Sequence, residues 1–598
     1  MAYKNIDSYG LIGDLHTAAL VSTDGSIDWC CLPRFDSPSV FGAMLDDRQG
    51  GYFRVWATSE GRYKQMYLPD TNVLMTRFLS PDGIGEVLDF MPWVEKGTRR
   101  GGLVRIARCV RGCVSFRMEC VPAFDYARQK HEVQIIDRTV RFGSPALSLT
   151  LESECKLEPF GNGGVSAEFT LAENQKRSFI LEMDEGNREE RPDLDAYTRD
   201  QLFRTIGKWR GWASRCTYVG RWREIVMRSA LTLKLLTYEP TGAIIAAPTC
   251  SLPEAIGGVR NWDYRYVWIR DAAFSVYALL RLGYFDEATQ FMDWLQARTA
   301  EKQELAPLQV MYRVDGSSDV REETLEHLSG YRDARPVRIG NSASQQLQLD
   351  IYGELIDSIY LYNKYAEPIS YDFWNYVRTL AYWLCDNWRK PDQSIWEFRK
   401  DPQQFTYSKM QCWVALDRCL RIALKRNLPI DLNRLRRESQ EIYELIMREG
   451  WDGQSFVQTL GGDSVDASSL LFSLMLFVSA RDWRMQSTTN RILKDLTSDS
   501  LVYRYRTDRR ADGLPGREGT FSMCTFWLAE VLSRAGRLEE ARFMFEKMHT
   551  YGNHLGLYAE EIGPSGEASG NFPQAFTHLG LISAALSLDR QLSQKRHP

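Results

Sequence analysis

Residues 261–271 read Asn-Trp-Asp-Tyr-Arg-Tyr-Val-Trp-Ile-Arg-Asp, and an apolar helical pattern follows at once over 272–282. Four aromatic rings alternate with charged residues in this stretch, which closes on the adjacent Arg270 and Asp271. Sugars offer apolar ring faces to aromatic side chains and hydroxyls to charged partners. The stretch therefore fits a carbohydrate pocket at a helix entrance, or an amphipathic turn that holds a structural ion pair.

Apolar residues recur with a period of 3.6 from about residue 220 to the end of the chain. Segments such as 468–480 and 521–532 are apolar on nearly all sides, whereas 431–449 carries a broad charged face. Buried helices that alternate with half-exposed ones predict two concentric rings. A helical solenoid is the alternative, although no fixed-period repeat supports it. The twelve predicted helices lie near 221–237, 271–282, 285–299, 344–365, 370–388, 408–426, 431–448, 468–480, 487–497, 520–535, 537–551 and 572–592.

The first 180 residues instead contain short segments rich in β-branched residues and bounded by Gly, Pro, Asp or Asn. This spacing predicts an antiparallel sandwich. A polar stretch over 184–195 marks the boundary with the helical region, and a connecting helix is expected at about 196–215. The predicted strands lie at 68–78, 84–90, 103–110, 114–120, 132–136, 139–141, 147–151 and 165–171.

The string NWDYRYVWIRDA resembles the signature of glycoside hydrolase family 15, which holds glucoamylases, glucodextranases and bacterial and archaeal trehalases. Residues 9–41 are similar to the N-terminal domain of the trehalase-like members. The resemblance implies a multidomain chain: an N-terminal antiparallel β-sandwich over 1–190, a linker over 191–219, and an all-α (α/α)6 barrel over 220–598. The segment 29–36 is expected either to reach the barrel mouth or to pack between the domains.

A candidate general acid lies in the segment Ser-Ile-Trp-Glu-Phe-Arg at 394–399. Flanking aromatic rings would desolvate Glu397 and favour its protonated form, as a general acid requires. The competing interpretation is a loop glutamate paired with Arg399. Similarity to the family's Trp-Glu motif assigns the acid role to Glu397.

A pair of adjacent carboxylates follows in the segment Gly-Leu-Tyr-Ala-Glu-Glu at 556–561. Taken alone, such a pair could be solvated, bind a cation or activate water. The resemblance makes Glu560 the general base, with Glu561 as runner-up because a one-residue slip is open.

The remaining site residues follow from the resemblance, position by position. Tyr264 and Trp268 are expected to line the wall around the non-reducing glucose, and Arg270 and Asp271 to bond its outer hydroxyls. Trp396 would add the adjoining wall. The segment 516–521 looks like a pocket loop, in which roles cannot be divided between Arg517 and Glu518.

Together these residues predict an inverting, exo-acting α-glucoside hydrolase, with trehalose as the favoured substrate. Fungal glucoamylases follow the acid with a second sugar-binding glutamate, whereas this chain has Phe398 there. The alternative is a hydrolase that releases β-glucose from α-1,4 or α-1,6 gluco-oligosaccharides. A phosphorylase and a silent sugar-binding regulator are disfavoured, because both glutamates are present.

Composition excludes several other classes. The net charge is −4 with acidic and basic residues interspersed, so no nucleic acid partner is expected. No run is apolar enough for a membrane span or a signal peptide, which predicts a cytoplasmic enzyme. The twelve cysteines and seven histidines show no metal-ligand spacing, so we expect reduced thiols, no metal and no cofactor. A homo-oligomer is compatible with the sequence.

Overall fold

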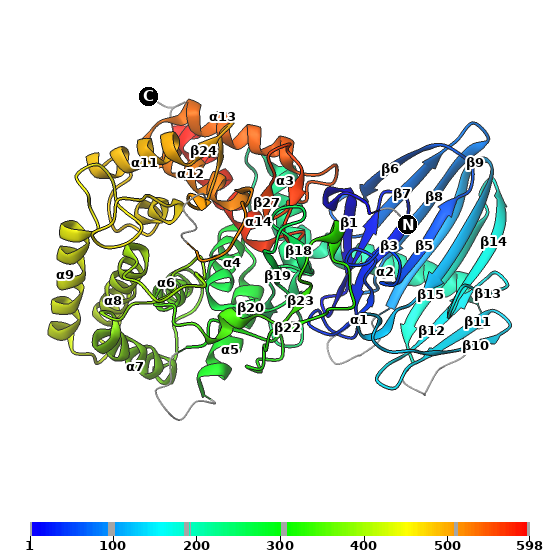
Figure 1. The fold of residues 1–598 in the computed structure, drawn as a ribbon, viewed down its shortest axis with the longest axis horizontal. Coiled ribbons are helices and arrows are strands. Elements are labelled where there is room, and N and C mark those ends of the chain that lie inside the picture. The colour runs from blue at the N-terminus through cyan, green and yellow to red at the C-terminus, as the bar shows by residue number, and fades with distance from the viewer. Residues whose placement is uncertain are drawn as a thin grey trace.

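The computed structural model describes residues 3–93, 102–184, 191, 193–300, 308–507 and 512–594. Figure 1 shows a β-domain at the N-terminal end of the chain beside a larger helical domain. The helical domain contains the stretch 261–271, so the fold of this second domain decides where a site can form.

The N-terminal domain is an antiparallel β-structure built around one long strand, β9 (Gly102–Val121). The first half of β9 pairs with β8 (Gly83–Phe90) and β15 (Lys176–Met183), and its second half with β5 (Tyr52–Ala57) and β14 (Gly164–Ala172). Two sheets therefore share this strand, as the predicted sandwich requires. The other strands are β1 (Tyr9–Gly13), β2 (Ala18–Ser22), β3 (Ser26–Cys31), β4 (Ser39–Phe41), β6 (Arg62–Tyr67), β7 (Leu74–Leu79), β10 (Glu132–Ile136), β11 (Thr139–Gly143), β12 (Ser148–Ser153) and β13 (Glu158–Phe160).

The strands predicted separately at 103–110 and 114–120 are the two halves of β9. Gly112 lies between them with a φ of 73°, a conformation that glycine adopts without steric cost. Gly112 suggested a break between two strands, because glycine often ends a strand. Here it marks the point where the strand passes from one sheet to the other.

A connecting helix, α2 (Leu194–Ala213), leads from the β-domain to the barrel, close to the predicted 196–215. Its start is capped by Asp193, whose side chain accepts a hydrogen bond from the backbone of Ala196. Leu194, Leu202 and Ile206 pack against apolar side chains of the sheet. The helix is therefore fixed to the β-domain.

The helical domain is a closed double ring. Helix α12 is buried on every side over Ser522–Ser533, whereas α9 buries only one stripe, which includes Leu435, Ile442 and Ile446. The inner ring is α4 (Ile269–Leu282), α6 (Asp350–Tyr365), α8 (Thr406–Arg426), α10 (Leu471–Leu474), α12 (Ser522–Ala535) and α14 (Ala575–Gln594). The outer ring is α3 (Arg223–Leu235), α5 (Phe285–Ala300), α7 (Tyr371–Asn387), α9 (Leu432–Glu449), α11 (Trp483–Asp495) and α13 (Leu538–Met548).

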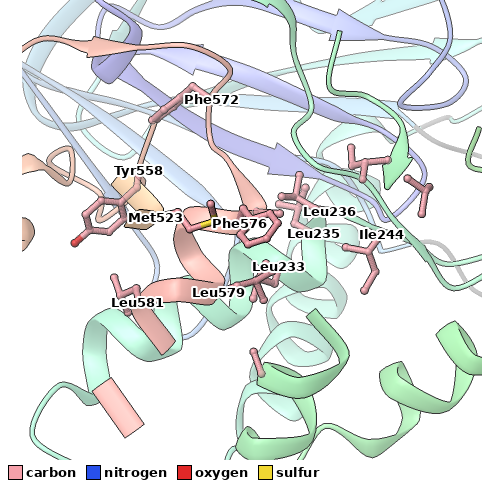
Figure 2. Packing of buried hydrophobic residues seen from close by; sticks show 14 of the residues in the cluster. Leu233, Leu235, Leu236, Ile244, Met523, Tyr558, Phe572, Phe576, Leu579 and Leu581 are labelled. Atoms are coloured by element: carbon pink, nitrogen blue, oxygen red, sulfur yellow. The ribbon is translucent and has the colours of Figure 1, made fainter. Parts of the chain in front are cut away.

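The ring closes where the last inner helix meets the first ones. Helix α14 packs against both α3 and α4. Figure 2 shows the apolar cluster at this closure, with Leu233 from α3 and Phe576 and Leu579 from α14. The predicted (α/α)6 barrel is confirmed.

Two predicted inner helices are shorter than expected. The helix predicted at 344–365 begins at Asp350, because Ser342–Gln345 forms a 3-10 turn capped by Asn341. The helix predicted at 468–480 ends at Leu474, and Leu476 has a φ of 63° that no right-handed helix allows. Apolar patterning could not reveal these breaks, since a helix and an irregular segment can carry the same run of apolar residues.

The two domains contact each other through specific hydrogen bonds. Trp29 Nε1 donates to the carbonyl of Pro248 at 2.7 Å, and Arg265 Nη1 donates to the carbonyl of Ser37 at 2.7 Å. The segment 29–36 thus packs against the barrel, which was one of its two expected roles. Among the described residues no helix combines the length and apolar character needed to span a bilayer. All twelve cysteines are free thiols, most of them buried.

Candidate active site

A pocket lies at the end of the barrel where the inner helices begin. The loops before α4, α8, α12 and α14 supply its walls. The lining residues are Ala246, Glu254, Arg260, Trp262, Tyr264, Trp268, Arg270, Asp271, Ile395, Trp396, Glu397, Arg399, Arg504, Tyr505, Asp512, Leu514, Phe521, Met523, Gln574 and Phe576. Six of the residues singled out from the sequence therefore share one pocket: Tyr264, Trp268, Arg270, Asp271, Trp396 and Glu397.

The deep wall is formed by the first turn of α4. Arg270 Nε donates to Asp271 Oδ1 at 3.1 Å, and Arg270 Nη1 donates to the carbonyl of Ile395 at 3.0 Å. Burial raises the pKa of Asp271 to about 6, although the Arg270 charge lowers it. A buried guanidinium beside a carboxyl offers both donors and acceptors, which suits recognition of neighbouring sugar hydroxyls.

Glu397 lies beside this pair. Its Oε1 accepts a 2.7 Å hydrogen bond from Trp268 Nε1 and lies 3.5 Å from Arg270 Nη2. The side chain is 18% exposed, and its backbone has a φ of 56°. A non-glycine residue in this region costs about 1–3 kcal/mol and is often found at functional sites. The competing interpretation, a Glu397 paired with Arg399, is not what the structure has, because Arg399 contacts Glu322 and Ser342.

The two aromatic residues that flank Glu397 in the sequence have different surroundings. Trp396 lines the pocket, and its Nε1 donates to Asp466 Oδ2 at 3.1 Å. Phe398 turns away and stacks on Phe405 with 5.1 Å between ring centroids. The Gln346 side chain donates to the carbonyls of Glu397 and Phe398. The loop that carries Glu397 is thus held by packing and by the polar segment before α6.

Glu560 lies behind Tyr264 rather than among the lining residues. Its Oε1 accepts a 2.7 Å hydrogen bond from the Tyr264 hydroxyl, and its Oε2 accepts one from the backbone of Asn571 at 3.1 Å. A Cβ atom on Gly570, which has a φ of 73°, would lie 2.4 Å from Oε2. Burial raises the pKa of Glu560 to about 7, against the opposing effect of the Tyr264 hydrogen bond.

Glu561 points in a different direction. It begins β27 (Glu561–Ile562), which pairs with β26 (Thr520–Phe521). Its Oε2 accepts a hydrogen bond from the backbone of Gly519 at 2.8 Å. Burial raises its pKa well above the ordinary value, and the neighbouring carboxylates raise it further.

Three buried carboxyl groups meet around one guanidinium. Arg504 Nη2 lies 2.6 Å from Glu518 Oε2, 2.9 Å from Glu254 Oε2 and 3.4 Å from Glu561 Oε1. The three carboxyl groups lie within 4.8 Å of one another, close enough for a metal ion. Arg504 already contacts all of them, however, so their donor set is matched to a guanidinium rather than to a metal.

Other predicted residues lie off the pocket surface. Arg517 is exposed and is not a lining residue, and Glu518 is buried behind the wall against Arg504. Several lining residues were not singled out from the sequence: Glu254, Arg260, Trp262, Arg399, Arg504, Tyr505 and Phe521. Trp262 lies in the motif at 261–271 and Arg399 in the segment 394–399. Their positions in the sequence could therefore have identified them as pocket residues. No sequence signal could have identified Glu254 and Arg504, because only the fold brings these two residues together.

Comparison with known proteins agrees with this geometry. The family description "Glycosyl hydrolases family 15" matches residues 220–586. The chain belongs to glycoside hydrolase family 15. A second description, "Trehalase-like, N-terminal", matches residues 2–195, which hold the β-domain. Membership makes this chain a glycoside hydrolase that acts on a carbohydrate.

Family 15 relatives align along nearly the whole chain. A protein named trehalase from Mycolicibacterium smegmatis is 39% identical over 98% of this chain and 92% of its own length. A trehalase from Thermoplasma volcanium is 38% identical over 99% of this chain and 95% of its own length. Both domains are therefore shared with these relatives.

A solved structure shares the fold at low identity. A bacterial glucoamylase complexed with acarbose superimposes with a TM-score of 0.71 at 14% identity, over 100% of this chain and 97% of that chain. This likeness supports the two-domain architecture of the family 15 chain, a β-domain followed by a barrel.

Proposed function

We propose that this family 15 enzyme hydrolyses trehalose to two molecules of glucose by an inverting mechanism. The observation that carries the proposal is a pair of carboxyl groups held by two adjacent pocket rings. Trp268 holds Glu397, Tyr264 holds Glu560, and the two ring centroids lie 5.3 Å apart. Full-length similarity to proteins named trehalase supports trehalose as the substrate.

Glu397 acts as the general acid in this proposal. Its carboxyl lines the pocket directly, next to the Arg270 and Asp271 pair that binds the outer hydroxyls of the sugar. A carboxyl in that position can reach the glycosidic oxygen and protonate it as the bond breaks. The second glucose then leaves with a neutral hydroxyl.

Glu560 acts as the general base and removes a proton from the attacking water. Its pKa of about 7 leaves a substantial ionised fraction near neutral pH, as a base requires. Burial and the neighbouring carboxylates raise the pKa of Glu561 well above its ordinary value. The geometry also favours Glu560, because it contacts the lining residue Tyr264, whereas Glu561 turns toward Gly519.

The proposal of inversion is supported by the different positions of the two carboxyl groups. Inverting glycosidases hold their carboxyl groups about 6.5–9.5 Å apart, which leaves room for a water on the opposite face of the sugar. Glu397 lines the pocket beside Trp268, whereas Glu560 lies behind Tyr264, so the two carboxyl groups are held by different rings. The low exposure of Arg270 and Asp271, 10% each, supports exo action, because the sugar they bind would lie at the buried end of the pocket.

A substrate comparison tests the proposal. The ratio of kcat/KM values measures how well an enzyme discriminates between competing substrates. We expect trehalose to be hydrolysed with a higher kcat/KM than maltose, isomaltose, maltotriose or isomaltotriose, without added phosphate. A higher kcat/KM for either trisaccharide would mean that the enzyme is an oligosaccharide glucosidase rather than a trehalase. Glucose phosphate as the product would mean that the reaction is phosphorolysis rather than hydrolysis.

A further inference from the structure

The pocket extends beyond Glu397 toward the barrel mouth. Side-chain exposure rises along this path, from 10% for Arg270 and Asp271 to 18% for Glu397 and 23% for Arg399. A general acid lies between the two sugars that it separates. The residues on the mouth side of Glu397, namely Arg399 and Trp262, therefore face the leaving sugar.

Arg399 is held in a fixed plane by Trp262. Its guanidinium carbon lies 4.6 Å from the centroid of the Trp262 ring, and Trp262 Nε1 donates to Glu254 Oε1 at 3.1 Å. Arg399 also contacts Ser342 and Glu322, and the Glu322 oxygen lies 3.4 Å from Nη2. A guanidinium has five N–H donors, so donors remain for a ligand.

The residue that could compete for this role points elsewhere. Phe398, directly after Glu397, stacks on Phe405 and packs against Tyr505 at 5.2 Å. It has no polar group to offer a sugar. On the mouth side of Glu397, the residue that can bind sugar hydroxyls is therefore Arg399, which follows Phe398 in the sequence.

The loops around Arg399 are bonded to one another. Arg260 forms a buried ion pair with Asp512, and Tyr505 donates to the same carboxylate at 3.0 Å. The carbonyl of Asp512 accepts a hydrogen bond from the backbone of Arg399 at 3.1 Å. Three loops are thus fixed together next to Arg399, so the lining around this side chain is held in place.

We propose that Arg399, held flat by Trp262, binds hydroxyls of the leaving glucose. The proposal rests on the trehalose-hydrolysing function proposed above. Trp262 acts as a positioning residue, since it orients the guanidinium. Charged hydrogen bonds of this kind correspond to roughly 10–150-fold in kcat/KM.

The test compares trehalose with α-glucosyl fluoride, which has no second sugar and whose fluoride leaves without protonation. In Arg399→Leu we expect kcat/KM for trehalose to fall at least about tenfold, while the value for the fluoride stays within about threefold. Retained fluoride hydrolysis also shows that the variant is folded. Arg399→Lys keeps the charge but not the planar fork, and should lose at least about fivefold on trehalose alone.

Arg338→Leu is the matched control. Arg338 also packs over Trp262, at 4.7 Å, and contacts Glu322 at 3.5 Å, but it does not line the pocket. We expect its trehalose kcat/KM to stay within about threefold of wild type. Equal losses on both substrates in Arg399→Leu, or the same trehalose loss in Arg338→Leu, would overturn the assignment. A wild-type enzyme that hydrolyses the fluoride but not trehalose would instead contradict the proposed function.

Discussion

The hydroxyl of Tyr264 donates a 2.7 Å hydrogen bond to Oε1 of Glu560, so a pocket ring connects directly to a carboxyl buried behind it. The same ring packs edge-on against Trp268, which holds Glu397. Two carboxyl groups distant in sequence are therefore fixed by neighbouring residues of one motif. The expectations below follow from this arrangement.

The two proposed catalytic glutamates should respond differently to the leaving group. We expect Glu397→Gln and Glu560→Gln each to lower kcat for trehalose at least about a hundredfold, the low end for general acid–base catalysis. With α-glucosyl fluoride, Glu397→Gln should recover much of its activity, because fluoride needs no proton. Glu560→Gln should remain impaired, since water still needs a base. Steady-state kinetics on both substrates, with circular dichroism as the folding control, checks this; equal recovery in both variants contradicts the assignment.

The pH profile should report Glu560. Its pKa is raised to about 7 by burial, and a protonated base cannot accept a proton from water. We therefore expect kcat/KM for trehalose to fall as pH is lowered through about 7. In Tyr264→Phe the hydrogen bond that favours the charged carboxylate is lost, so this acidic limb should move to higher pH. If the acidic limb is unchanged in the variant, the group that titrates there is not the Glu560 carboxyl bonded to Tyr264.

Removal of Arg504 should destabilise the protein, more strongly at high pH than at low pH. Arg504 neutralises Glu254, Glu518 and Glu561, and an uncompensated buried charge costs about 3–5 kcal/mol. In Arg504→Leu the pKa values of Glu254 and Glu561 should rise further above their unfolded values. Groups with raised pKa contribute stability below the unfolded pKa of about 4.3 and lose it as pH rises through the folded pKa. Burial already raises the pKa of Glu254 to about 8, so the relevant window is pH 5 to 8.

Thermal denaturation of wild type and Arg504→Leu at pH 5 and pH 8 gives the measurement. The difference in Tm between the two proteins should be larger at pH 8. An equal difference at both pH values would mean that Arg504 stabilises the wall by packing alone.

Arg270→Ala should weaken both substrate binding and turnover. Arg270 faces the pocket but also bonds the carbonyl of Ile395, so some loss of thermal stability is expected as well. Loss of kcat/KM by at least about tenfold, beyond any folding defect, indicates a role in transition-state binding. A variant with lowered Tm and unchanged kcat/KM would mean that Arg270 has only a structural role, as the partner of Asp271 in an ion pair.

Much of the fold could be predicted from the sequence, because apolar periodicity reports burial directly. Helix α9 shows one apolar stripe and α12 is apolar all round, which identifies outer and inner helices. The early end of the inner helix at Leu474 was missed, since a left-handed backbone at Leu476 leaves no trace in apolar pattern. Leu476 is 63% exposed, so an apolar residue at this position does not report a buried helix face.

The site was predictable where it is local in sequence. The motif at 261–271 and the segment around Glu397 each supply neighbouring lining residues. The grouping of Glu254, Glu518 and Glu561 around Arg504 could not be predicted, because it joins loops far apart in the chain. Arg517 was selected because the segment 516–521 looks like a pocket loop, yet Arg517 is exposed and only Glu518 is buried against Arg504.

The most direct test of the account is the anomeric form of the glucose released from trehalose, recorded by proton NMR before mutarotation. Inversion at the anomeric carbon attacked by water yields β-glucose, while the leaving glucose keeps its α configuration. The account predicts equal initial amounts of α- and β-glucose. Initial release of α-glucose alone would indicate retention and would contradict the roles proposed for Glu397 and Glu560.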